Sequence, residues 1–201
     1  MEFVEYELKS EILCMGERVK GGIFRPCVHT IPYSQITGAL KKKFGKNLHA
    51  VGYLIQDGEH NQTDYLIYSP RDRFKKLSKL PLQTEVLANV LGRIFIPLIE
   101  SFDLPENFEI RMGAFLSKGF GKCKLNRINT ITISEVKKGI LSVRIPEKYR
   151  DIFGIKNVIK PVYGYLFEPI TISQGIYTRS LFEGSVVFGP NFLLKEEGNY
   201  G

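Results

Sequence analysis

The most apolar stretch of the sequence runs from Gln83 to Ile99 and places the strongest constraint on the fold. Its large apolar side chains recur at intervals of one, three or four residues, at Val86, Leu87, Val90, Leu91, Ile94, Phe95, Leu98 and Ile99. Intervals of this kind place apolar side chains on one face of an amphipathic helix. We therefore predict a helix over this stretch, with Pro97 kinking or ending its last turn.

The N-terminal part of the chain predicts a strand and a short helix. Apolar and polar residues alternate loosely over residues 4–15, which predicts an opening strand, and a loop follows over residues 16–33. Residues 35–44 predict a helix because apolar residues recur there at every fourth position. Ser34 is a candidate N-cap for this helix and Gly45 a candidate C-cap.

Two further strands and a looped strand complete the expected order. Residues 49–56 and 63–69 predict a hairpin that turns at residues 57–61. Residues 108–125 predict a strand that runs into a glycine-rich loop and out again. Together with the two helices these elements give the order β-α-β-β-α-β, which is typical of ferredoxin-like and RRM-like folds.

The remaining residues predict a β-rich extension. We expect a hairpin over residues 130–145, turning at residues 137–139, and then a tail rich in glycine and aromatic residues over 163–192. The predicted fold class is therefore α+β, with an RRM-like domain over residues 1–127. The extension, residues 128–201, is expected to pack on that same domain.

Composition indicates a cytoplasmic protein with a polyanionic partner. The 201 residues are 43% hydrophobic, enough for a full core, and carry a net charge of +7. Basic side chains clustered beside glycines favour binding to phosphates. The acidic N-terminus does not resemble a signal peptide, and no apolar run approaches the roughly 20 residues that span a bilayer. We therefore expect a cytoplasmic location and no membrane partner.

The glycine-rich loop is the main candidate for contact with a polynucleotide. Glycine allows backbone amides to approach a ligand closely, and neighbouring lysines supply positive charge. The loop lacks the Gly-Lys-Ser/Thr ending of a nucleotide-binding P-loop. A tight turn with solvated lysines is the alternative interpretation. The candidate RNA-binding residues are Gly113, Ser117, Lys118, Gly119, Phe120, Gly121, Lys122 and Lys124.

The start of the helix over residues 35–44 is a second candidate site. A helix N-terminus offers free amides and the positive end of the helix dipole, and lysines follow it here. The alternative is an amphipathic helix whose lysines are merely solvated. Basic side chains elsewhere join this group, one in the preceding loop and one near the C-terminus, the latter beside aromatic residues. The additional candidates are Ser34, Gln35, Lys41, Lys42, Arg25 and Arg179.

The sequence gives little support for catalysis or for a metal. The three histidines are scattered, and His29 is only a weak candidate for acid-base chemistry. Cys27 lies two residues from His29, but no second pair completes a zinc site. Cys14, Cys27 and Cys123 are therefore expected to be reduced thiols. We expect no cofactor and no metal.

Two motifs together resemble the RAMP superfamily of CRISPR-associated proteins. Members commonly begin a helix with Ile-Pro-Gly-Ser-Ser-x-x-Gly-x-x-Arg and carry a glycine-rich loop that ends in Ser-Arg-Gly-Phe/Tyr-Gly. This chain has Ile-Pro-Tyr-Ser-Gln-Ile-Thr-Gly-Ala-Leu-Lys over residues 31–41 and Ser-Lys-Gly-Phe-Gly over 117–121. Tyr33 and Gln35 replace the usual Gly and second Ser, and Lys41 and Lys118 replace Arg, so charge is kept without bidentate contacts.

The resemblance implies a subunit that binds guide (CRISPR) RNA inside a multisubunit interference complex. The family's repeat-RNA endonucleases usually carry the glycine loop close to the C-terminus, whereas 80 residues follow Gly121 here. Some family members cut target RNA with an aspartate in the loop before the helix, but residues 16–33 contain none. Both differences favour binding over cleavage.

Two alternatives remain open. The first is a metal-independent endoribonuclease that processes CRISPR repeat RNA, using His29 with a nearby Lys or Tyr. The second is an assembly protein, whose basic loops dock on a partner subunit and never meet RNA. The sequence alone does not separate these functions from RNA binding.

Overall fold

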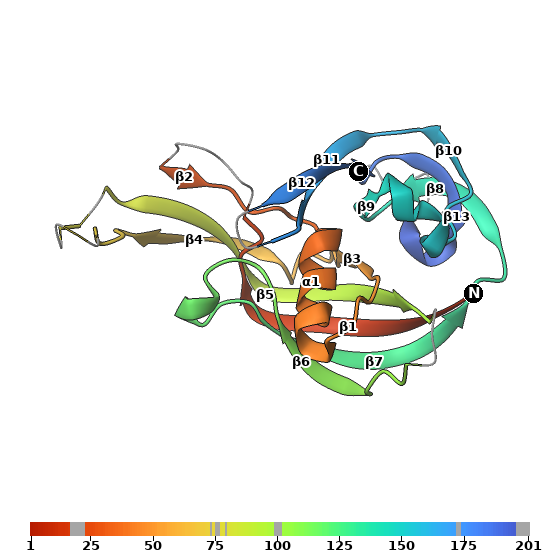
Figure 1. Ribbon diagram of the computed structural model, residues 1–201, viewed down its shortest axis with the longest axis horizontal. Helices are drawn as coiled ribbons and strands as arrows, with labels where there is room; N and C mark the ends of the chain where they lie inside the picture. Colours follow the sequence, from red (N-terminus) through yellow and green to blue (C-terminus); the bar gives the residue numbers. More distant parts are fainter. Residues whose placement is uncertain are drawn as a thin grey trace.

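A seven-stranded sheet with one helix on its face forms the larger part of the molecule (Figure 1). The computed structural model describes residues 1–16, 23–72, 74, 77, 78, 80–98, 102–171 and 174–195. The elements of this part are β1 (Glu2–Leu13), β2 (Phe24–Arg25), α1 (Tyr33–Phe44), β3 (Val51–Leu54), β4 (Gln62–Tyr68), β5 (Leu82–Pro97), β6 (Asn107–Arg111), the 3-10 turn η1 (Leu116–Lys118) and β7 (Lys122–Thr132).

The sheet is antiparallel apart from the short β2, which runs parallel to β5. Its main path is β2-β5-β1-β7-β6, and β3 and β4 both pair with β5. Val4, Tyr6 and Leu8 of β1 point to the same face of the sheet, where Ile36 and Leu40 of α1 meet them in the first hydrophobic core. This core holds α1 against the sheet.

A β-rich extension follows β7 and forms two smaller sheets, ordered β10-β13-β8-β14 and β11-β12-β9. Its elements are β8 (Val136–Leu141), β9 (Ile145–Pro146), η2 (Glu147–Phe153), β10 (Asn157–Lys160), β11 (Tyr163–Pro169), β12 (Gly175–Leu181), β13 (Val186–Pro190), η3 (Asn191–Leu193) and β14 (Leu194–Lys195). The α+β class, RRM-like with a β-rich extension, is the class predicted from the sequence.

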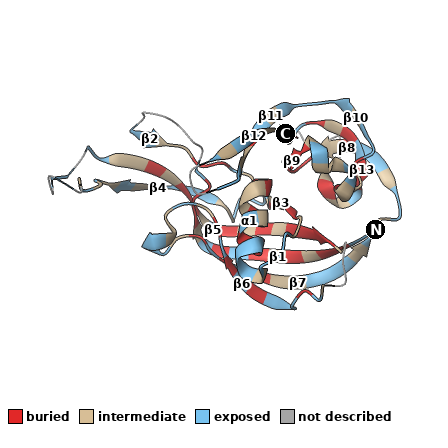
Figure 2. Cartoon of the chain, viewed as in Figure 1, coloured by how far each residue is buried: buried red, intermediate tan, exposed pale blue. Residues whose placement is uncertain are grey.

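The extension covers one end of the sheet face that lies opposite α1. Phe3 and Phe95 alternate with the helix-facing side chains of β1 and β5, so they point to the opposite face. They enter a second core together with Phe153 and Phe192 of the extension. Figure 2 shows the buried residues gathered on the strands nearest α1 and the extension, while β4 is mostly exposed. The division into residues 1–127 and 128–201 stays a prediction.

The predicted helix over residues 83–99 is wrong, because Leu82–Pro97 is a 16-residue strand, β5. Asn89 has a φ of +49°, and the core-facing side of the strand changes there from Val90 to Leu87. Leu87 and Val90 therefore both face the core although they are three residues apart, which is the spacing expected on one face of a helix. The second half of β5 is also buried on both faces, by α1 and by the extension, which removes the alternation expected of a strand.

The predicted hairpin over residues 49–69 is also wrong. β3 pairs with residues 92–95 of β5 and β4 with residues 82–88, so the two strands lie end to end along β5. Asn61 bridges the gap, since its side chain donates to the carbonyls of Ile55 and Leu91 and accepts the Leu91 amide. After the turn at residues 57–61 the chain therefore pairs with an earlier segment of β5 and not with β3.

Two smaller expectations also fail. Residues 137–139 lie inside β8, which pairs with β13 and not with β7, so the predicted hairpin over 130–145 is absent. Ser34 lies in the first turn of α1 and is not its N-cap; Pro32 holds that position, with its carbonyl accepting the amides of Gln35 and Ile36. The C-cap prediction is confirmed, because Gly45 has a φ of +70° and donates to the Lys41 carbonyl.

Candidate nucleic-acid interface

The glycine-rich loop joins β6 to β7 and is built around four residues with positive φ. Gly113, Phe115, Gly119 and Gly121 have φ values of +88°, +57°, +89° and +73°. L-residues with a side chain rarely adopt this region, so glycine is favoured at three of these positions by backbone geometry alone. The loop conformation is therefore encoded in the sequence.

The three glycines nevertheless differ in what surrounds them. A Cβ on Gly113 would lie 2.5 Å from the Cys14 carbonyl oxygen, and one on Gly121 would lie 2.0 Å from the Met112 carbonyl oxygen. A Cβ on Gly119 would meet no atom within 4 Å. Gly113 and Gly121 thus serve packing, whereas the space beside Gly119 is open to a ligand.

The loop amides are mostly used inside the protein. Ala114 donates to the carbonyl of Cys14, just after β1, and Gly121 donates to the carbonyl of Ile12 on β1. Lys118, Gly119 and Phe120 donate to carbonyls within the loop, at Phe115 and Leu116. The sequence-based expectation of an amide cradle for phosphate is not supported at these five positions. Contact with a ligand here depends on side chains.

Lys118 lies over the ring of Tyr68 on β4, with Nζ 3.9 Å from the ring centroid. Tyr68 also meets Phe115 edge to face, and Phe115 meets Phe120, at centroid distances of 5.5 Å and 6.1 Å. The loop is thereby docked against the β4–β5 hairpin. Ser117 is exposed in η1 beside this cluster.

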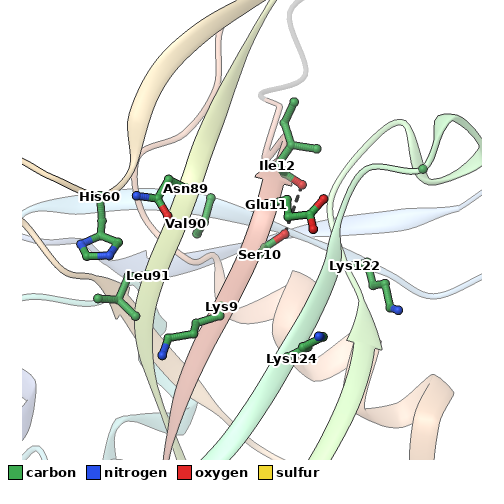
Figure 3. Close-up of a pocket in the computed structure, with 11 residues that line it drawn as sticks. Lys9, Ser10, Glu11, Ile12, His60, Asn89, Val90, Leu91, Lys122 and Lys124 are labelled. Atoms are coloured by element: carbon green, nitrogen blue, oxygen red, sulfur yellow. Dashed lines mark hydrogen bonds between the residues drawn. The ribbon is translucent and has the colours of Figure 1, made fainter.

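A pocket of about 420 Å³ lies between the loop and the point where β5 changes faces (Figure 3). Its basic residues are Lys9 of β1 and Lys122 and Lys124 of β7, joined by His60. Lys9 and Lys124 are direct cross-strand partners. The other lining residues are Ser10, Glu11, Ile12, Asn89, Val90, Leu91 and Gly119. We call this set the lysine pocket.

Acidic neighbours offset part of the charge of the lysine pocket. Lys9 pairs with Glu7 at 2.6 Å, and Lys122 pairs with Glu109 at 3.2 Å. Within the described residues no ion pair is found for Lys124. Sequence reasoning identified Lys122 and Lys124 but missed Lys9, which the alternation of β1 already places on the face opposite Leu8.

The start of α1 contributes to a second pocket, of about 530 Å³. Ser34 and Gln35 form one side of it, and aromatic residues of the β11–β12 hairpin form the other. Gly16, three residues after the end of β1, also lines this pocket, and the carbonyl of nearby Cys14 accepts a hydrogen bond from the glycine loop. The two predicted sites therefore lie on either side of the end of β1 and do not share one pocket.

The remaining candidates are dispersed. Lys41 lines a separate depression with Ser34, and Lys42 is exposed in the last turn of α1. Arg25 lies in β2, paired with Thr84 on the edge of the hairpin. Arg179 lies on β12 and stacks on Tyr163, with 3.7 Å between the guanidinium carbon and the ring centroid. The basic candidates thus cover more than one face.

An unpredicted pair lies in the depression that Lys41 lines. The Tyr33 hydroxyl is 2.5 Å from His49 Nδ1, and Tyr149 stacks on Tyr33. Burial raises the pKa of Tyr33, so the hydroxyl stays protonated and donates. Burial lowers the pKa of His49, which favours the neutral imidazole that accepts this bond.

His29, the weak catalytic candidate, lies in an exposed loop. Its Nε2 is 2.6 Å from the Glu85 carboxylate, and its side chain is 51% exposed. It lies outside the lysine pocket and the second pocket. This contact orients the imidazole.

The three cysteines are free and buried. The hydrogen bond that the Cys27 thiol donates to the Cys14 side chain is lost on deprotonation, so this bond and burial both raise the pKa of Cys27, which disfavours the thiolate that zinc requires. Among the residues that the structure describes, no group of three or more His, Cys, Asp or Glu side chains is placed to hold a metal. No described helix is long and apolar enough to cross a membrane.

Comparison with known proteins gives similarity of fold. No family model matches the sequence, and no curated protein matches it. A chain of the type III-B Cmr-beta complex bound to cognate target RNA and AMPPnP matches with a TM-score of 0.54 and 10% identity, covering 94% of this chain and 86% of the other. A chain of the same complex bound to cognate target RNA matches with a TM-score of 0.52 and equal identity and coverage. The fold is therefore one that also occurs in a chain of the type III-B Cmr-beta complex.

Proposed function

We propose that this protein binds guide RNA as a non-catalytic subunit of a multisubunit CRISPR interference complex in antiviral defence. The lysine pocket carries the proposal. It places Lys9, Lys122 and Lys124 around the open space beside Gly119. Ammonium groups in this arrangement fit successive phosphates of one RNA strand.

The shape of the site favours contact with the backbone over reading of bases. Lysine is a flexible point charge with no planar fork, so it binds phosphate without selecting a base. Gly119 leaves room for a sugar-phosphate chain to pass close to the loop. A subunit that binds in this way tolerates guide RNAs of different sequence.

The fold comparison supports the same function and suggests the partners. The similar chains belong to complexes described as type III-B Cmr-beta bound to cognate target RNA. Each of these chains shares only 10% identity with this one, so the similarity of fold is combined here with the lysine pocket, which is observed in this chain itself. We infer that other effector subunits are its protein partners.

Filter binding of labelled single-stranded RNA over a salt series tests the proposal. Lys122→Ala and Lys124→Ala should each weaken binding and reduce the magnitude of the salt slope by about 0.7, the value for one lost phosphate contact on a single strand. Lys156→Ala is the matched control, because Lys156 is exposed in the extension and its substitution removes the same charge away from the lysine pocket. Equal effects of all three changes, or none, would contradict the proposal.

The absence of catalysis is tested separately. Labelled CRISPR repeat RNA, incubated with the protein in the presence of a metal chelator, should remain intact. Cleavage that disappears in His29→Ala would instead support the endoribonuclease alternative. Because the lysine variants report on binding, the two experiments address different parts of the proposal.

A further inference from the structure

The β11–β12 hairpin presents a row of aromatic side chains on one face. Tyr165 pairs with Arg179 across the hairpin, and Phe167 pairs with Tyr177. Direct partners in an antiparallel pair point to the same face, so these four side chains form one surface. Tyr165 and Tyr177 are 66% and 61% exposed, which is unusual for large aromatic residues with no ligand.

This aromatic surface forms one wall of the second pocket. Tyr165, Phe167 and Tyr177 face Ser34 and Gln35 at the start of α1 across a volume of about 530 Å³. Pockets of this size accept small organic ligands. The opening is flanked by rings on one side and by the positive end of the α1 dipole on the other.

Gln35, which lines the pocket, carries a polar group without a partner. The side-chain Oε1 of Gln35 is buried and has no hydrogen-bond partner among the described residues. A buried acceptor without a partner is costly, so a ligand that donates an N–H bond would be favoured here. Nucleobases carry such donors on their edges and present flat aromatic faces as well.

We propose that this pocket holds an unpaired nucleobase of the bound RNA, stacked on Tyr165 and Tyr177 with its edge toward Gln35. The inference rests on the proposed RNA-binding function and identifies the bound form as single-stranded at this point. Tyrosine rings stack on any base, so the site holds the strand without selecting its sequence. In a duplex the base faces and edges are occupied, and the pocket would be closed to them.

Charge favours RNA over a protein as the occupant. The Arg179 guanidinium lies 3.7 Å from the Tyr163 ring centroid, at the end of the same aromatic surface. Its only described carboxylate contact is with Glu147, at 3.3 Å, and its side chain is half exposed. Aromatic rings combined with an exposed arginine are typical of single-strand binding grooves.

Binding of a labelled oligouridylate tests the inference against the lysine pocket. Tyr165→Ala and Tyr177→Ala should each weaken binding at least fivefold, roughly the loss measured for one stacked base, while the salt slope stays unchanged. Tyr165→Phe and Tyr177→Phe keep the rings and should retain binding. Both tyrosines are exposed, so the alanine variants should fold, which thermal melting checks.

A fluorescent reporter gives a second, direct readout. The sequence contains no tryptophan, so Tyr165→Trp introduces a single emitter into the pocket. Stacking of a base on this ring should quench its emission when the oligouridylate is added. Tyr65→Trp, at an exposed tyrosine on β4, is the control and should not be quenched.

The outcomes separate the two proposals. Weaker binding in the lysine variants combined with normal binding in Tyr165→Ala and Tyr177→Ala would overturn the inference and leave the proposed function standing. If the wild-type protein does not bind RNA at all, both fall. Equal quenching of Tyr165→Trp and Tyr65→Trp would also overturn the stacking of an unpaired base. So would an equal loss of affinity for duplex and for single-stranded RNA in Tyr165→Ala and Tyr177→Ala.

Discussion

Lys118 of the glycine loop and Tyr68 of β4 form a cation–π pair in which Nζ lies 3.9 Å from the ring centroid. The residues are 50 positions apart in the chain, and their contact fixes the loop against the β4–β5 hairpin. Lys118 is thus a docking residue as well as a candidate phosphate ligand. Substitution of Lys118 should therefore affect the stability of the protein as well as the binding of phosphate.

A double-mutant cycle with Lys118→Ala and Tyr68→Ala should give a coupling free energy of about 0.5–1 kcal/mol, the value for an exposed cation–π pair. Urea unfolding monitored by circular dichroism measures it. Tyr68→Phe keeps the ring and should show no loss. Additive single mutants would mean that the contact does not hold the loop.

Gly121 and Gly119 should respond very differently to alanine. Gly121→Ala places a Cβ 2.0 Å from the Met112 carbonyl oxygen at positive φ, and we expect destabilisation by about 3 kcal/mol. Gly119→Ala meets no neighbour and should cost only about 1 kcal/mol, the penalty for its φ. Thermal unfolding of both variants measures the difference, and equal losses would disprove it.

Asn89 should be replaceable by glycine but not by valine. Its φ of +49° is accessible to glycine, whereas a β-branched residue is strained there by about 2 kcal/mol. Asn89→Gly loses only the weak hydrogen bond that the Asn89 side-chain amide donates to the Glu59 carbonyl, at 3.3 Å. We therefore expect the free energy of unfolding to fall by less than about 0.5 kcal/mol. Similar unfolding free energies for the two variants would argue against the break in β5.

The same residue explains why β5 was predicted as a helix. A strand that changes faces within three residues places Leu87 and Val90 in one core, and periodicity alone cannot distinguish this from a helical turn. The elements specified locally were predicted correctly: α1 with its Gly45 cap, the position of the glycine loop and the overall α+β class. Pairing between distant segments, as between β8 and β13, was not.

The residues of the candidate site were likewise predicted where they are neighbours in sequence and missed where strand pairing or packing brings them together. Lys122 and Lys124 were found because they adjoin the glycines in sequence, while Lys9 reaches the lysine pocket through its pairing with Lys124. Tyr165 and Tyr177 meet Gln35 only through packing of the extension. No local pattern encodes contacts over 130 residues.

His49 should make stability depend on pH. Burial lowers its pKa in the folded protein below the ordinary value of 6.5, so the unfolded chain takes up the proton first. The stabilisation is therefore complete above about pH 6.5 and is lost as the pH falls through the folded pKa. Urea unfolding of wild type and His49→Gln should show a difference that shrinks from about pH 7 to about pH 5. A constant difference would exclude this effect.

The strand β5 is partly exposed to solvent at its first residues and is enclosed by two hydrophobic cores at its last residues. Its first residues, near Gln83, pair with the edge strand β4, while Ile94 and Phe95 are enclosed by α1 and the extension. Amide hydrogens along this one strand should therefore exchange with solvent by different routes. Those near Gln83 will exchange through local fraying, and those near Phe95 only when the whole molecule unfolds. The strand thus spans the full range of local stability in the protein.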